Sequence, residues 1–165
     1  MFAVGEEIVY GSMGVCSVED ICLMDVPGAA RECYLLIPRY VPNSKIYAPV
    51  ENNPVEMRRL LSKTQVETLL ESLPEIQAFP IQKERAGQYD LYRCAINSAD
   101  SVELAKLIKT LHERKQDILR TKKMIPIAEK ELFDKAEMIL YGEIASVLGI
   151  PFSGVEEYFK QRIQS

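Results

Sequence analysis

The sequence is poor in the residues that build catalytic or metal centres. It has one histidine, His112, and no cysteine, aspartate or serine is spaced beside it as a nucleophilic site requires. Its four cysteines, Cys16, Cys22, Cys33 and Cys94, contain no CxxC pair. This spacing argues against a zinc site and against a disulfide framework, and it favours reduced thiols in a cytoplasm.

Other missing sequence patterns exclude further classes of protein and of functional site. The sequence has no run of about 18 apolar residues, so no transmembrane helix is predicted, and its start lacks the basic and apolar regions of a signal peptide. The segment Gly11-Ser-Met-Gly14 lacks the Lys-Ser/Thr and helix of a phosphate-binding loop. Acidic pairs such as Glu131 and Asp134 fall on predicted surfaces rather than around a pocket. We therefore expect a cytoplasmic protein that is not an enzyme, with no cofactor, no metal and no membrane partner.

The first part of the chain has the alternation of half-buried antiparallel strands. Two strands flank the glycines at 11 and 14, and others are predicted at 33–38, 45–50 and 57–61. Short strands joined by tight turns favour a small SH3- or Tudor-like barrel. After the turn, the alternation places Cys16, Val18 and Cys22 on one face. The predicted core consists of Val4, Ile8, Cys16, Val18, Tyr34, Leu36 and Ile46.

Beyond the strands the chain is predicted to be helical, and after residue 80 the apolar period is 3.6. Ser62 is a predicted N-cap for a short helix at 64–73, and a proline-bearing link follows at 74–80. Helices are predicted at 82–97, from Ser98 or Ser101 onward, from Pro126 to Leu148, and from residue 153 or 154 to the end, with Gly149 closing the third. The fold class is thus α+β. The predicted division is a barrel at 1–61, a short helix and linker at 62–80, and an all-helical domain at 81–165.

Charge is distributed unevenly between these parts. The net charge is −4, but residues 1–80 carry six bases against eleven acids, and residues 81–165 carry fourteen against thirteen. Residues 106–123 alone hold seven bases and two acids. Such a segment can contact nucleic-acid phosphates, although a solvated helix face explains it equally well. The aromatics Phe79, Tyr89 and Tyr92 lie near Arg85 and Arg93. Such aromatics can contact bases, but core packing is the default interpretation for them.

Two separated stretches resemble the CarD family of bacterial transcription regulators, which share their N-terminal module with the transcription-repair coupling factor. The first runs from Phe2-x-Val-Gly-Glu-x-Ile-Val-Tyr10 through Gly14-Val15 and Tyr34-Leu-Leu to Ile46-x-x-Pro49-Val-Glu-Asn52 and Arg59-x-Leu61. The second is Ser98-Ala-Asp100 with Leu104-Ala-Lys-Leu-Ile-Lys-Thr-Leu111, followed by Lys130 through Leu140-Tyr-Gly-Glu143-Ile-Ala. The pieces occur in the family's order over nearly the whole chain.

The resemblance implies a Tudor-like domain that docks on the β subunit of RNA polymerase. It also implies a helical, DNA-binding domain that contacts promoter DNA at the upstream edge of the transcription bubble and changes open-complex stability. The implied polymerase contacts are Met24, Val26, Ile46 and Tyr47. An arginine common in relatives is Tyr47 here, which makes the expected contact more apolar.

The sequence departs from the family in its second half. Relatives use a tryptophan as a minor-groove wedge, and this chain has no tryptophan. An ungapped match places Arg85 at that position, whereas a shifted match brings Phe79 close to it. Phe79 is therefore the candidate wedge, and the expected phosphate contacts are Arg85, Arg93, Lys122, Lys123 and Lys130.

The sequence thus predicts a transcription regulator whose partners are RNA polymerase and promoter DNA. The alternative is an adaptor that docks on polymerase while its helical domain binds another protein. We expect a monomer, with a strand-swapped dimer as the alternative.

Overall fold

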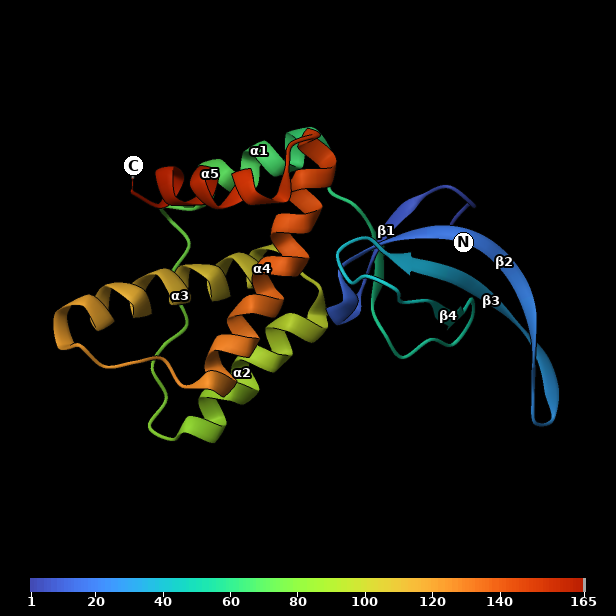
Figure 1. Cartoon of the computed structure of the whole chain (residues 1–165), viewed down its shortest axis with the longest axis horizontal. Coiled ribbons are helices and arrows are strands. Elements are labelled where there is room, and N and C mark those ends of the chain that lie inside the picture. The colour runs from blue at the N-terminus through green and yellow to red at the C-terminus, as the bar shows by residue number, and fades with distance from the viewer. Residues whose placement is uncertain (165) are drawn as a thin grey trace.

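The computed structural model describes residues 1–164, apart from the side chains of Val26 and Gln164. Five strands form one antiparallel sheet in the order β4-β3-β2-β1-β5. Strands β2 and β3 make a long hairpin that projects away from the helices (Figure 1). The ladder ends at β4 on one side and at β5 on the other, so the sheet is open, and the Tudor-like barrel stays a prediction. The strands are β1 (Glu7–Tyr10), β2 (Val15–Val26), β3 (Ala29–Pro38), β4 (Ile46–Pro49) and β5 (Met57–Arg59).

The inner face of the sheet holds a small apolar cluster of its own. Most of the predicted core is found there, and Ile46 packs at its margin. Val4 is not part of it, because its residue is 57% exposed in a turn at Gly5, which has a φ of 90° and ends the alternation before β1. The prediction for Val4 is therefore wrong. The buried members of this inner cluster are Ile8, Tyr10, Cys16, Val18, Tyr34, Leu36 and Ala48.

A bulge in β2 reverses which residues face this cluster. The register of β2 against β3 slips after Val18, so that Glu19 is left without a partner in the ladder. One extra residue exchanges the two faces of a strand beyond it. Ile21 consequently packs against the inner cluster, while Cys22 turns to the outer face. The prediction that Cys22 shares a face with Cys16 is wrong for this reason.

Five helices follow the sheet within the described residues, and their ends show why they start and stop. The predicted N-cap Ser62 is confirmed: its hydroxyl accepts from the Gln65 N–H at 3.1 Å, and the Gln65 side chain returns a bond of 2.8 Å to the Ser62 N–H. Gly149 ends α4 in the left-handed conformation, as predicted. The helices are α1 (Lys63–Ser72), α2 (Arg85–Ser98), α3 (Ser101–Thr121), α4 (Ile127–Leu148) and α5 (Phe152–Gln164), with a 3-10 turn, η1 (Gly11–Met13), after β1.

Two predicted helix starts need correction. Neither Ser98 nor Ser101 caps α3; Asp100 does, because its carboxylate accepts from the N–H groups of Val102 at 2.9 Å and Glu103 at 3.1 Å. The second helix begins at Arg85 rather than at residue 82, because the side chain of Gln88 holds the preceding segment in an extended path. It accepts from the Gln82 N–H at 2.5 Å and donates to the Pro80 carbonyl at 3.1 Å.

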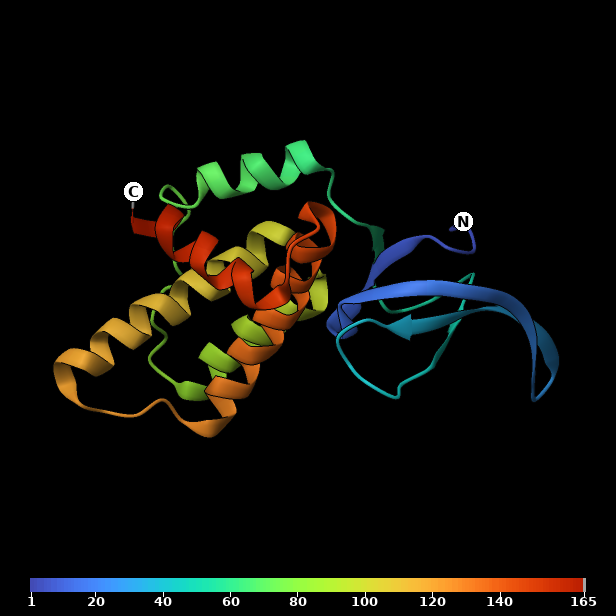
Figure 2. The ribbon, with the colours of Figure 1, turned by 45° about the horizontal axis from the view of Figure 1, so that its top comes forward.

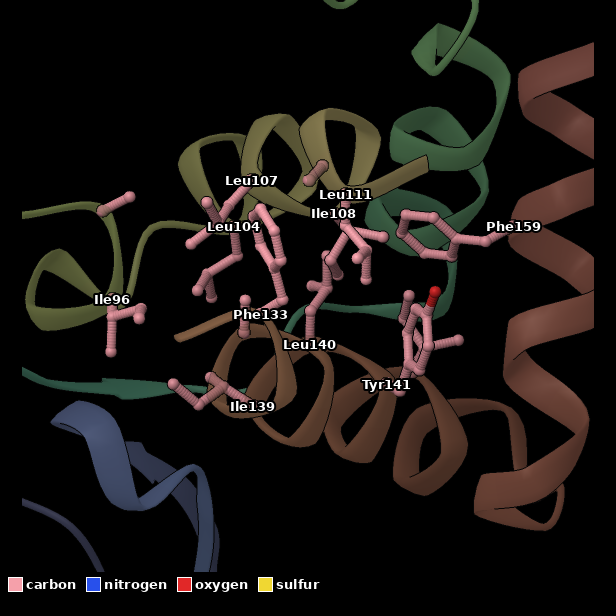
Figure 3. Packing of buried hydrophobic residues seen from close by; sticks show 14 of the residues in the cluster. Ile96, Leu104, Leu107, Ile108, Leu111, Phe133, Ile139, Leu140, Tyr141 and Phe159 are labelled. Carbon is pink, nitrogen blue, oxygen red and sulfur yellow. The ribbon is translucent and has the colours of Figure 1, made fainter. Parts of the chain in front are cut away.

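The helices share one apolar core around α4. Figures 1 and 2 show α2, α3 and α5 lying along different sides of it. Side chains from these helices interdigitate in Figure 3, where Phe133 lies beside Leu104 and Leu107, and Phe159 lies near Tyr141. Among the described residues no single helix is long and apolar enough to cross a membrane. Helices α4 and α5 pass that test only as a pair, and they are bent by 101° at their junction.

The outer face of the sheet meets this core at one end. Val9 of β1 belongs to the helical core, and the 3-10 turn η1 lies against α2 and α4. Gly142 lets the Tyr40 ring approach α4 closely, because an added Cβ at this position would lie 2.6 Å from that ring. The Tyr40 hydroxyl donates to the Gly142 carbonyl at 3.2 Å, so the loop after β3 sits directly on α4.

We expect Gly142→Ala to lower the free energy of unfolding by about 1–3 kcal/mol, since the methyl group displaces the Tyr40 ring. The control is Gly87→Ala in α2, where nothing lies within 4 Å of an added Cβ. There the better helix propensity of alanine raises stability by about 0.5–1 kcal/mol. Urea denaturation of both variants checks this, and equal stabilities would contradict the close approach.

Candidate functional site

The sheet and the helices are joined by a buried ion pair. The Glu143 side chain, on α4, is 0% exposed. Two Arg58 nitrogens from β5 donate to it, Nη1 to Oε2 at 2.6 Å and Nη2 to Oε1 at 2.7 Å. The Leu61 N–H donates a third bond at 2.8 Å, and Arg58 Nε donates to the Ala99 carbonyl at 2.8 Å. This junction therefore ties β5 to α4 and to the turn between α2 and α3.

The local sequence explains why Arg58 reaches this site. Successive strand residues point to opposite faces, and Arg58 lies opposite Val9, which packs in the helical core. Its neighbour Arg59 points to the other face, where Nε donates to Glu6 at 2.7 Å. Sequence reasoning missed Glu143 as a buried group. The available signal was an acid inside the apolar run Ile139-Leu-Tyr-Gly-Glu-Ile-Ala145, because buried charges occur when a partner is supplied.

The residues predicted to contact polymerase divide between the two sheet faces. Tyr47 lies opposite Leu35 and Met24 opposite Arg31, so Tyr47 and Met24 share the outer face. Tyr47 is 48% exposed there. Ile46 points inward and packs against the inner cluster. Val26 ends β2, but its side chain lies outside the described residues.

Phe79, the candidate wedge, is half-buried and packed into the helical part. Its ring meets that of Tyr92 edge-on at 6.0 Å between centroids, and Lys106 Nζ lies 5.8 Å from the ring centre. Its N–H donates to the Thr110 hydroxyl at 3.0 Å. A ring held in this way would have to leave these contacts to enter a base step.

Phe79 and Arg85 do come together at one cavity. It has a volume of about 290 Å³ and lies between the segment before α2 and helices α2, α3 and α4. Burial, reinforced by the Glu129 carboxylate, raises the pKa of Tyr92 on its wall to about 12. That hydroxyl therefore stays protonated at neutral pH and can act as a donor.

The basic segment 106–123 is largely occupied by internal contacts. Arg114 donates to the buried Glu129 through Nε at 2.9 Å and Nη2 at 3.2 Å. Lys109 Nζ donates to the Leu73 carbonyl beyond α1 at 2.7 Å. Lys106 and Arg120 pair with acids on their own helix. The high local charge of this segment therefore reflects helix packing more than a surface for nucleic acid.

The residues predicted to contact phosphates differ in whether they already form an ion pair within the protein. Arg93 pairs with Asp90 at 3.2 Å and Lys130 with Asp134 at 2.9 Å. Within the described residues, Lys122 and Lys123 make no ion pair, and both are exposed in the turn after α3. Figures 1 and 2 both place the start of α2, this turn and the start of α4 at the end of the helical part away from the sheet. The structure thus gathers at one end the segments that carry Arg85, Lys122, Lys123 and Lys130.

Two family profiles match this chain. The profile of the CarD-like/TRCF RID domain matches residues 2–61, and that of the CarD C-terminal domain matches residues 77–160. The chain belongs to the CarD-like family. The family consists of transcription factors that interact with RNA polymerase and are not enzymes. A comparison with curated proteins found no match.

The residues of the buried ion pair come from both matched segments. The first ends at Leu61, whose N–H binds Glu143, and Glu143 itself lies within the second. Helix α1 falls between the matches, inside the segment 62–80 predicted as a short helix and linker. It packs against α4 and α5, with Val66, Leu69 and Leu70 buried in the helical core.

We expect Arg58→Met to lower the free energy of unfolding by about 3–5 kcal/mol, because it leaves the Glu143 carboxylate buried without its partner. Arg59→Met is the matched control. It removes an exposed pair with Glu6 from the adjacent residue and should cost about 0–1 kcal/mol. Chemical denaturation compares the two, and similar losses would show that Glu143 does not depend on Arg58.

Proposed function

We propose that this protein is a transcription regulator that docks on the RNA polymerase β subunit through a Tudor-like sheet and contacts promoter DNA through its helical part. The DNA contact lies at the upstream edge of the transcription bubble and changes the stability of the open complex. The observation that carries this proposal is the pair of family matches, both modules being present in order on one chain. We place the protein in a bacterial cytoplasm, where its partners act.

The outer face of the sheet supports the docking half of the proposal. Strand β4 is an edge strand, so one side of it pairs with no other described strand. Edges of this kind are used to add a strand from a partner, with neighbouring side chains giving specificity. Tyr47 is on this edge and exposed, and aromatic residues are favoured anchors in interfaces.

The basic end of the helical part supports the DNA half. The α3–α4 turn carries Lys122 and Lys123 beside Met124, which is 89% exposed. Methionine, isoleucine and phenylalanine can all be inserted between base steps by proteins that bind the minor groove. Because Phe79 is packed against Tyr92, Met124 is a second candidate for the wedge.

A specific observation favours the adaptor as a second candidate. Phe79 is held in the helical core, and Arg93 and Lys130 are each paired with an acid. The packing of Phe79 and the two ion pairs both weaken the expected binding to DNA. In the adaptor, the exposed apolar residues at this end would contact another protein instead.

Tyr47→Glu is expected to weaken binding to RNA polymerase by about 1–3 kcal/mol, because it buries an unpaired charge in the interface. Leu119→Glu makes a comparable change at an exposed apolar residue of the helical part and should leave this affinity unchanged. Biolayer interferometry with immobilised polymerase measures both. An unchanged affinity for Tyr47→Glu removes this residue from the interface.

The DNA contact is tested by fluorescence anisotropy of a fork-junction promoter fragment bound to polymerase. We expect the wild-type protein to slow dissociation of this complex, with an effect that falls as salt rises, since phosphate contacts release counterions. Replacing both Lys122 and Lys123 with Gln should reduce the salt slope by about one per lost contact. The control is Lys63→Gln, at an exposed lysine at the start of α1, which lies away from this end and should leave the salt slope unchanged.

The same assay separates the two candidate functions. Loss of the effect in Met124→Ala identifies Met124 as the wedge. Loss in Phe79→Ala identifies Phe79 only where circular dichroism shows that this variant keeps its helical fold, because the ring also packs against Tyr92. A wild-type protein that binds polymerase yet leaves the DNA signal untouched is an adaptor, and the DNA half of the proposal is then wrong.

A further inference from the structure

Two cysteines face each other across the hairpin of the sheet. In the register of β2 against β3, Cys22 lies directly opposite Cys33, and both are free thiols. Directly opposed residues project from the same face. The bulge at Glu19 determines this arrangement, because it turns Cys22 to the outer face where Cys33 already lies.

The ladder fixes how close the two backbones come. The Val50 N–H donates to the Glu32 carbonyl at 3.0 Å, so Cys33 and Pro49 form a non-hydrogen-bonded pair toward β4. The N–H and C=O of Cys33 therefore point the other way, toward Cys22. The Cα atoms of such a hydrogen-bonded pair are about 5.5 Å apart, inside the range of about 4.4–6.8 Å that a disulfide spans.

We propose that Cys22 and Cys33 are a site of reversible oxidation that forms a disulfide across the hairpin. The oxidant is a low-molecular-weight disulfide. The Cys22 thiolate, which is the more exposed of the two, attacks one sulfur of the oxidant, forms a mixed disulfide and releases one thiol. Cys33 then loses its proton and attacks the Cys22 sulfur, which releases the second thiol. One disulfide is reduced for each one that is formed.

The other cysteines are poorly placed to compete. Cys16 lies in the inner cluster, and burial raises the pKa of its thiol to about 12, so it is not a nucleophile at neutral pH. Cys94 is exposed on α2, in the helical part, and lies away from the hairpin. Cys33 is 5% exposed, so its accessible partner is the cysteine opposite rather than a molecule in solution.

The disulfide would alter the face that we assign to polymerase, and this consequence rests on the proposed function. Opposed Cβ atoms in a ladder are about 4.5–5.5 Å apart, whereas a disulfide draws them to about 3.5–4.5 Å. The strands must therefore approach each other locally. Met24 lies two residues along from Cys22, and Tyr47 is opposite Leu35, two residues from Cys33. The oxidised hairpin should consequently bind polymerase severalfold more weakly.

The experiment treats the full chain carrying Cys94→Ser with oxidised glutathione and measures its intact mass. We expect a product lighter by two hydrogens, with Cys22 and Cys33 linked in the same peptide map, and full reversal by dithiothreitol. Cys33→Ser in the same background is the matched control, and it should instead retain one glutathione. If the parent chain also retains glutathione, or links between chains, the disulfide site is wrong.

Polymerase binding is then measured for the oxidised and reduced forms by interferometry. A severalfold loss of affinity that dithiothreitol restores supports control of docking. It should be absent in Cys22→Ser in the same background, whose remaining cysteines, Cys16 and Cys33, are both buried. Equal affinities of the two forms would overturn that control. The mass measurement does not involve polymerase, so a failure of the docking proposal is distinguishable from a failure of the disulfide.

Discussion

The ion pair between Arg58 and Glu143 decides how the sheet meets the helices. A carboxylate with no exposed surface is tolerated because a guanidinium and a backbone N–H satisfy it together. A buried ion pair adds little net stability compared with apolar packing of the same volume. It does require one geometry, since both arginine nitrogens must meet both carboxylate oxygens. We interpret the junction as the element that orients the two parts.

This orientation matters for a protein that would hold two partners at once. The proposed docking strand and the basic end of the helices lie at opposite ends of the molecule (Figure 1). A flexible joint would let each end bind independently, and the second contact would then carry the entropy cost of ordering the joint. With the Tyr40 loop and η1 also packed on α4, the two faces are set at a fixed spacing. A fixed spacing lets binding at one end determine where the other end reaches.

Sequence reasoning recovered the parts of this fold that depend on local pattern. The capping box at Ser62 and the left-handed end at Gly149 follow from residue types whose local geometry is nearly obligatory. It failed where a long-range contact or one inserted residue decides the outcome. The face of Cys22 depends on a bulge that alternation does not reveal, and the burial of Glu143 depends on an arginine 85 residues away.

The candidate site shows the same division. The exposure of Tyr47 was predictable from strand parity, and the grouping of Lys122 with the start of α2 was not, because it arises from helix packing. The charge of residues 106–123 was misleading, because Arg114 and Lys109 use their charge to hold neighbouring helices. The amino-acid composition gives only the number of charged residues, whereas binding to nucleic acid depends on which of them remain unpaired.

The bulge at Glu19 has a consequence for how this chain could vary among its relatives. Because the bulge absorbs one extra residue, deleting Glu19 would leave the partners of β2 in β3 unchanged and would remove only the local bend. Ile21 would still face the inner cluster, and Cys22 would stay on the outer face. Relatives that are one residue shorter at this point should therefore keep the same two faces and differ in how strongly the hairpin bends.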